Sequence, residues 1–202
     1  MTKRWGNLAE SSLCSLPYIP CSLLLLQYFR NHMTRTKWTE RTFTFDFPEG
    51  WMFNILERLR GTTARITWIT FSLSEEVLTY KPEGKWSIKE EIGHLIDLEE
   101  LHIGRIEDFL ARKEILRAAD MSNQKTLDAR HNERKLEDLL SEFAMHRNQF
   151  VSRLEELDDE TYLFKSFHPR LQVMMRPVDV AYFTAEHDDH HLSTMRERTL
   201  VS

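Results

Sequence analysis

Apolar residues recur at three- and four-residue spacing along most of the chain, which is the pattern of amphipathic α-helices. The pattern predicts four helices, over about residues 50–75, 87–112, 125–157 and 175–198. Only six glycines and six prolines occur in 202 residues, so we expect few turns and long regular elements. Helices of this length bury their apolar stripes against one another. We therefore predict an all-α fold, a four-helix bundle.

Two of the predicted helices carry recognisable start signals. Ser87 and Glu90 have the spacing of a capping box, in which each side chain accepts a hydrogen bond from the other residue's backbone amide. Pro177 suits the first position of the last helix, where no amide donor is needed, and Asp179 places negative charge at the positive helix end. Residues 42–47 instead alternate between polar and aromatic, which predicts a short strand or an extended arm.

The first forty residues differ from the rest of the chain. Residues 11–29 are largely apolar, but prolines interrupt them, and the unbroken run is far shorter than the roughly 20 residues that span a bilayer. A secretory signal is disfavoured by an early acidic residue and by the lack of a small-residue cleavage site. We predict that 1–40 is a poorly structured extension of a domain over 41–202, and hypothesise that the native chain starts at Met33.

Composition narrows the class of protein and its partners. Hydrophobic residues at 41% and charged residues at 29% suit a soluble globular domain with a real core. The net charge is −5 and the sequence has no large basic stripe, so we expect no nucleic-acid partner. Because the apolar run is too short to span a bilayer, we also expect no membrane association and a cytoplasmic location. Cys14 and Cys21 both lie in the N-terminal extension. A metal site in the body would therefore use imidazole and carboxylate ligands.

Histidines supply the candidate chemistry. His187 and His191 lie four residues apart on the last predicted helix, so their side chains point the same way and can bind one metal ion. Such a pair also occurs by chance, and a third ligand must come from elsewhere; His94, in the second turn of the second helix, is the candidate. His190 lies about 100° from His191 and is interpreted as a flanking residue. Three further histidines on predicted helices are interpreted as surface or packing residues: His102, His131 and His146. His168, in the connection before the last helix, is interpreted as a residue that could line an entrance to the site.

Three imidazoles would leave a tetrahedral metal with one open position, which distinguishes a catalytic site from a closed structural one. Such a metal can lower the pKa of a bound water or thiol and so supply a nucleophile at neutral pH. Asp97, three residues after His94, is the preferred candidate either for the carboxylate that holds the second ring nitrogen of a ligand or for a general base. Motifs of phosphate loops, nucleophile elbows and H-E-x-x-H proteases are absent from the sequence. Other acids close in sequence leave the choice open: Glu90, Glu186, Asp188 and Asp189.

Two segments carry a family resemblance: Trp86-Ser87-x-x-Glu90-x-x-x-His94-Leu95-x-Asp97, and later His187-x-x-His190-His191. In this order and spacing they resemble the DinB-like superfamily, and the resemblance runs from about Trp51 to Arg198. It implies a four-helix bundle with a divalent metal held by three histidines, here His94, His187 and His191. After the last of these, many members have an Arg-Gly-Gln run where this chain has Leu192-Ser193-Thr194. Substrate and thiol choice therefore do not carry over.

Members of this family include thiol S-transferases that use low-molecular-weight thiols and proteins described as metal-dependent hydrolases, and many form dimers. The resemblance thus implies an enzyme that uses its metal to activate water or such a thiol for hydrolysis or group transfer on a small molecule. Zinc is the first expectation for the metal, with nickel or iron as alternatives. A homodimer is the assembly that the family suggests. The alternative function is a non-catalytic metal-binding or stress-response helical bundle.

Overall fold

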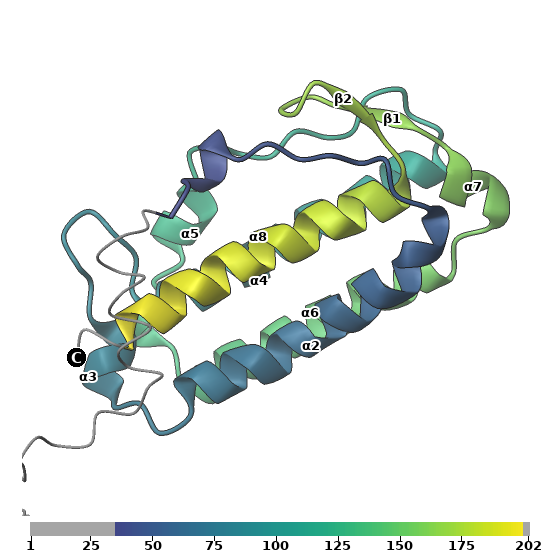
Figure 1. Ribbon diagram of the computed structural model, residues 1–202. Coiled ribbons are helices and arrows are strands. Elements are labelled where there is room, and N and C mark those ends of the chain that lie inside the picture. Colours follow the sequence, from purple (N-terminus) through teal and green to yellow (C-terminus); the bar gives the residue numbers. More distant parts are fainter. Residues whose placement is uncertain (1–34, 200–202) are drawn as a thin grey trace, which may run out of the picture. The chain divides into compact units, whose positions relative to one another are not determined.

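The computed structural model describes residues 35–199 (Figure 1). The chain divides into two units, Met1–Arg41 and Thr42–Ser202. In the first unit the described residues include one short 3-10 helix, η1 (Trp38–Glu40). The predicted N-terminal extension and the hypothetical start at Met33 lie almost wholly outside the described residues.

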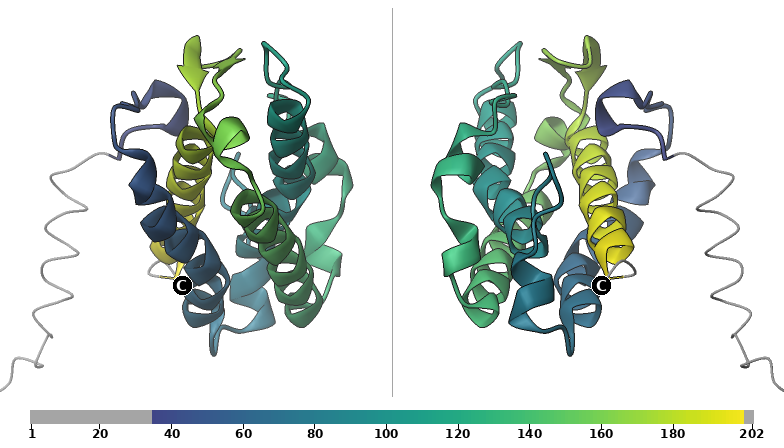
Figure 2. Two further views of the ribbon diagram at one scale, coloured as in Figure 1. Left: turned by 90° about the vertical axis from the view of Figure 1, so that its right-hand side faces the viewer. Right: turned by 90° about the vertical axis from the view of Figure 1, so that its left-hand side faces the viewer.

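Four long helices form the second unit: α2 (Met52–Thr70), α4 (Ile88–Leu110), α6 (Leu136–Glu155) and α8 (Pro177–Arg198). They pack side by side as a bundle, α4 most extensively against α6 and α2 against α8 (Figure 2). The predicted all-α four-helix bundle is confirmed. Among residues 35–199, no helix combines the length and the apolar character that crossing a membrane requires.

Two of the predicted helices are shorter than their apolar patterns suggest. The first ends at Thr70, because Ser72 adopts a left-handed backbone conformation (φ 64°), and the separate helix α3 (Glu75–Thr79) follows. The third is interrupted at Arg130, which is also left-handed (φ 49°). Its N-terminal part forms the short helix α5 and a 3-10 turn, η3, before α6 begins: Gln124–Asp128 and His131–Glu133.

The connection before α8 contains structure that the sequence did not predict. Helix α7 (Asp159–Leu163) leads into an antiparallel hairpin of β1 (Ser166–His168) and β2 (Val173–Met175), in which Phe167 pairs with Met174. Of the two alternatives predicted for 42–47, a short strand or an extended arm, the structure has the extended arm, followed by the 3-10 turn η2 (Glu49–Trp51). Its aromatic side chains pack on α8: the Phe43 ring lies 5.1 Å from that of Phe183, and Phe47 contacts Tyr182.

The interior of the bundle has two apolar clusters. One includes Leu59, Ile106, Phe150 and Ala181, towards the hairpin. The other lies towards α3, and its members include Ile66, Ile92, Phe143 and Met195. Each of the four long helices contributes to both clusters, so each has a short segment between the two.

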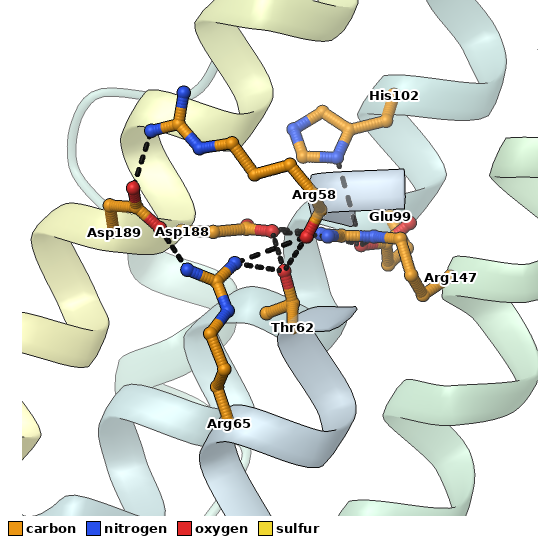
Figure 3. A network of polar contacts seen from close by, with 8 residues as sticks. All are labelled: Arg58, Thr62, Arg65, Glu99, His102, Arg147, Asp188 and Asp189. Carbon is orange, nitrogen blue, oxygen red and sulfur yellow. Dashed lines mark hydrogen bonds and ion pairs between the residues drawn. The ribbon is translucent and has the colours of Figure 1, made fainter. Parts of the chain in front are cut away.

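That segment carries a buried polar side chain on every one of the four helices: Thr62 on α2, Glu99 on α4, Arg147 on α6 and Asp188 on α8 (Figure 3). The Arg147 guanidinium donates to Glu99 Oε1 at 2.6 and 2.9 Å and to both carboxylate oxygens of Asp188. Thr62 Oγ1 donates to Asp188 Oδ2 at 2.8 Å. We call these four residues the polar layer. It ties all four helices together at one level of the bundle.

Candidate metal centre

Local signals set the start of both helices that carry the candidate ligands. Ser87 Oγ accepts from the Glu90 amide at 3.1 Å, and Glu90 Oε2 accepts from the Ser87 amide at 2.9 Å, so the predicted capping box is present. At the start of α8, Pro177 occupies the first turn as predicted. Asp179 accepts hydrogen bonds from the backbone amide and the guanidinium of Arg176. These caps fix where each helix begins and hence which residues face inward.

Three histidines from α4 and α8 come together in the structure. His94, His187 and His191 each offer one ring nitrogen, and these nitrogens all lie within 4.8 Å of one another. The Nε2 atoms of His187 and His191 are 3.0 Å apart, and the His94 ring centroid lies 4.8 Å from that of His191. The juxtaposition predicted from the sequence is therefore present, and the grouping is consistent with metal binding. We call it the histidine group.

Partners on the far side of two rings set their orientation. His191 Nδ1 is hydrogen-bonded to the Glu91 carboxylate, which accepts a second bond from Arg198 at 2.8 Å. Because an ionised carboxylate can only accept, Nδ1 of His191 carries the hydrogen and Nε2 presents a lone pair to the group. The second oriented ring is that of His94, on α4.

His94 Nδ1 lies 3.2 Å from the hydroxyl of Thr126, which donates its own hydrogen to Asp97 Oδ2 at 2.9 Å. A hydroxyl has one hydrogen, so Nδ1 of His94 must be the donor and its Nε2 also presents a lone pair. Two lone pairs then converge beside the Nε2 of His187. Nitrogen lone pairs that face one another are satisfied by a cation, so this donor set fits a divalent metal.

Burial keeps the rings of His94 and His187 in the state that binds metal. It lowers the pKa of His94 to about 2, with the neighbouring His191 as the next cause. Burial and the same neighbour also lower the pKa of His187 well below its usual value. Both imidazoles are therefore neutral near pH 7, which is the form that coordinates a metal ion.

Trp86 covers one side of the group. Its ring centroid lies 4.7 Å from that of His94, and it stacks over His191 at 6.4 Å. The residue is half-buried and directly precedes the Ser87 cap. The indole therefore shields two of the three imidazoles from water on that side.

The acids near the histidines have distinct partners. Asp97, predicted either to hold a ligand ring or to act as a base, accepts from the Thr126 hydroxyl, which is in turn hydrogen-bonded to His94 Nδ1. Asp97 also accepts from His131 Nε2 at 2.9 Å. The other candidates have partners elsewhere: Glu90 caps α4, Asp188 belongs to the polar layer, and Glu186 and Asp189 pair with Arg58.

Three contributors to the group were not identified from the sequence: Glu91, Thr126 and His131. Glu91 occupies the position where an apolar residue would complete a hydrophobic staple with Trp86, and that irregularity was the available signal. Thr126 and His131 lie in the loop region that was expected to be the start of a long helix. No local pattern connects them to a site on α4.

Gly93 is required for the position of His131. A Cβ atom on Gly93 would lie 2.1 Å from Cγ of the His131 ring, so the ring lies against the backbone of α4. Gly93→Ala is expected to reduce the free energy of unfolding by about 1–3 kcal/mol, because the ring must move. Urea unfolding monitored by circular dichroism measures the change.

Gly61→Ala is the matched control, because a Cβ on that helical glycine would meet nothing within 4 Å. There alanine should stabilise the helix by roughly 0.5–1 kcal/mol. Equal effects of the two substitutions would contradict the packing of His131 on Gly93.

Comparisons with known proteins identify a sequence family and agree with the four-helix fold. The sequence model of the DinB superfamily matches residues 58–195. A solved structure of YfiT from Bacillus subtilis, a probable metal-dependent hydrolase with an unusual four-helix bundle topology, is similar with a TM-score of 0.64 and 14% identity, over 79% of this chain and 91% of that one. A mycothiol-dependent maleylpyruvate isomerase is similar with a TM-score of 0.58 and 10% identity, over 73% of this chain and 60% of that one. Curated protein sequences gave no match.

Proposed function

This chain belongs to the DinB superfamily, and we propose that it is a metal-dependent enzyme whose ion is held by His94, His187 and His191. The substrate is a small molecule, and the reaction is hydrolysis or the transfer of a low-molecular-weight thiol. YfiT, a probable metal-dependent hydrolase, supports the first reaction type, and the mycothiol-dependent isomerase supports the use of a thiol. Zinc is the proposed metal, with nickel or iron as alternatives.

The observation that carries the proposal is the convergence of three imidazole nitrogens with two of the rings oriented from behind. Among residues 35–199, the group that could hold one ion consists of these three side chains, without a fourth protein ligand. A divalent ion bound by three ligands keeps a position at which it lowers the pKa of a water or thiol. A purely structural site would be closed by a fourth protein ligand, so this arrangement favours the enzyme over the non-catalytic bundle.

The surrounding residues have defined tasks in this proposal. Glu91 and Thr126 hold His191 and His94 in the tautomers whose Nε2 atoms accept a cation. Asp97 fixes the Thr126 hydroxyl and so acts as a positioning residue behind His94. Trp86 excludes water from one face of the rings, which strengthens electrostatic interactions there.

Elemental analysis of gently purified full-length protein tests the metal. About one equivalent of a divalent transition metal per chain is expected. A screen of low-molecular-weight thiols with an electrophilic acceptor, run beside a set of hydrolase substrates, then separates the two reaction types. Protein that is metal-free, and that takes up no zinc, nickel or iron on titration, would rule the proposal out.

Glu91→Gln is expected to weaken zinc binding by about 10–100-fold, because the charge that orients the His191 ring is removed. Competition with a chromophoric chelator measures the affinity. Glu142→Gln is the control, since Glu142 pairs with Arg134 and His146 on a partly exposed face of α6. Equal zinc affinity in wild type and Glu91→Gln would contradict the role of Glu91.

A further inference from the structure

Two donors are buried at the end of the bundle where the hairpin lies, away from the histidine group. Arg105 on α4 is 3% exposed and His168 on β1 is 1% exposed. The loop after α4 pairs with β1 through Ile115 and Phe167, and this pairing holds the hairpin beside the end of α4. Neither Arg105 nor His168 has a task in the proposed metal centre.

Arg105 is a buried guanidinium without a carboxylate partner in the described part of the chain. Its Nε donates to the backbone oxygen of Arg117 at 3.3 Å, and this is its one hydrogen bond to described residues. Asp108, whose charge favours that of Arg105, is itself hydrogen-bonded to Arg117 and Lys113. Burial lowers the pKa of Arg105 to about 10, with Asp108 opposing and the cations Arg170 and Arg117 adding to the effect. A charge buried in this way destabilises the fold unless an anion compensates it.

The neighbouring cation Arg117, unlike Arg105, already has carboxylate partners. A Cβ on Gly104 would lie 1.8 Å from Nη1 of Arg117, so that guanidinium lies across the backbone of α4. There it is paired with Asp108 and Glu107. Its charge is therefore already compensated, and Arg105 carries the uncompensated one.

His168 offers a second donor. Its Nδ1 accepts a hydrogen bond from the Leu171 amide at 3.2 Å, so the neutral ring carries its hydrogen on Nε2. Burial lowers the pKa of His168 to about 4, with Arg105 and then Arg170 as further causes, and the ring is neutral near pH 7. Nε2 is buried and meets no acceptor among the described residues. An unsatisfied buried donor is uncommon in proteins and indicates a ligand or an ordered water.

The two donors lie along the same side of the bundle as the histidine group. Arg105 follows His94 by eleven residues, so it lies only about 20° around α4 and about 16 Å further along the axis. Helical side chains lean towards the N-terminus, so that of Arg105 leans towards His94. On α8, Phe183 lies one turn before His187. Its ring centroid is 5.5 Å from that of His168, and the Arg170 guanidinium lies over it at 5.7 Å.

We propose that Arg105 and His168 bind the carboxylate of an elongated small molecule whose other end reacts at the histidine group. The guanidinium supplies paired, charged donors, and His168 Nε2 supplies a neutral one. The Phe183 ring, between the two sites, contacts the apolar body of the molecule. This assignment of the substrate class rests on the proposed function for its reactive end, whereas the anion site itself does not require a metal.

Isothermal titration calorimetry of full-length protein stripped of metal tests the anion site by itself. Benzoate, uncharged benzamide and inorganic phosphate are the probes. Benzoate should bind at least about tenfold more tightly than benzamide, because a charged hydrogen bond is lost with the amide. Arg105→Gln and His168→Phe should each weaken benzoate binding, the first by about tenfold or more. Arg196→Gln is the control, as it removes one exposed arginine at the other end of α8.

Thermal unfolding of the same variants shows whether they fold. Without ligand, Arg105→Gln should melt at the same temperature as wild type or higher, because a buried uncompensated charge has been removed. Benzoate should raise the melting temperature of wild type and of Arg196→Gln, but not that of Arg105→Gln. A merely structural Arg105 would instead lower the melting temperature when replaced.

The binding data can overturn either the anion site itself or its assignment to a carboxylate. Equal benzoate affinity in wild type and both variants, or no benzoate binding by wild type, overturns the anion site. Phosphate binding more tightly than benzoate overturns the carboxylate assignment. Metal-free protein whose benzoate binding depends on Arg105 would preserve the anion site while the proposed function fails. Metal content should be unchanged in Arg105→Gln, because that residue lies outside the histidine group.

Discussion

Replacing His191 with alanine is expected to abolish stoichiometric metal binding and, with it, any turnover. His191 Nε2 lies 3.0 Å from that of His187, and in the proposed centre these two rings are the ligands from α8. Loss of a direct ligand should weaken zinc binding by more than the roughly 10–100-fold expected for a residue behind a ligand. Elemental analysis after gel filtration, followed by chelator competition, measures both the content and the affinity.

His146→Ala is the matched control, because it removes a half-buried histidine on α6 that pairs with Glu142 outside the group. Its metal content should equal that of wild type. The double variant His187→Ala with His191→Ala gives the most stringent test. If it keeps a full equivalent of metal, the histidine group is not the binding site.

Replacing Arg147 with methionine is expected to reduce the free energy of unfolding by about 3–5 kcal/mol. Arg147 is 1% exposed and donates to Glu99 and Asp188, which are both fully buried. Methionine fills most of the volume but leaves two carboxylates without their cation. An unpaired buried charge is penalised more heavily than a lost surface ion pair. Urea unfolding followed by circular dichroism at constant pH measures the difference.

Arg60→Met is the control, because Arg60 bridges Glu57 and Glu155 on the surface of the bundle. It should change the stability by less than about 1 kcal/mol. A triple variant with Glu99→Gln, Arg147→Met and Asp188→Asn should be more stable than Arg147→Met alone, because no bare charge remains in it. If Arg147→Met and Arg60→Met were equally mild, the polar layer would contribute no more than a surface pair.

The polar layer also has a consequence for the histidine group. Asp188 directly follows His187, and its carboxylate is held by Arg147 from α6 and by Thr62 from α2. These bonds fix the rotation of α8 at the residue next to a candidate ligand. We therefore expect Arg147→Met to weaken zinc binding as well as stability, whereas Arg60→Met should affect neither.

Features that depend on neighbouring residues could be predicted from the sequence. The apolar periodicity located the four long helices, and the Ser87 and Glu90 pair marked the start of α4. The spacing of His187 and His191 placed them on one face of α8, because helix geometry alone relates residues four apart. These predictions hold since the interactions concerned lie within one or two turns of the same segment.

Features that depend on packing between distant segments required the tertiary structure. The first predicted helix ends before Ser72 and the third is interrupted at Arg130, because both residues have left-handed backbone conformations. Serine and arginine rarely adopt this conformation, so the residue types did not predict it. The sequence did not predict that Glu91 would be hydrogen-bonded to His191, because that contact forms only when α8 packs against α4.

The same holds for the buried charges. On its own segment Arg147 resembles any surface arginine, and it becomes the centre of the polar layer only because carboxylates from α4 and α8 surround it. Local spacing determined which side chains share a helix face, because the regular geometry of a helix fixes the relative direction of residues a few positions apart. Which faces meet was decided by close packing of the whole bundle, since partners such as Glu91 and His191, or Thr62 and Asp188, are a hundred or more residues apart.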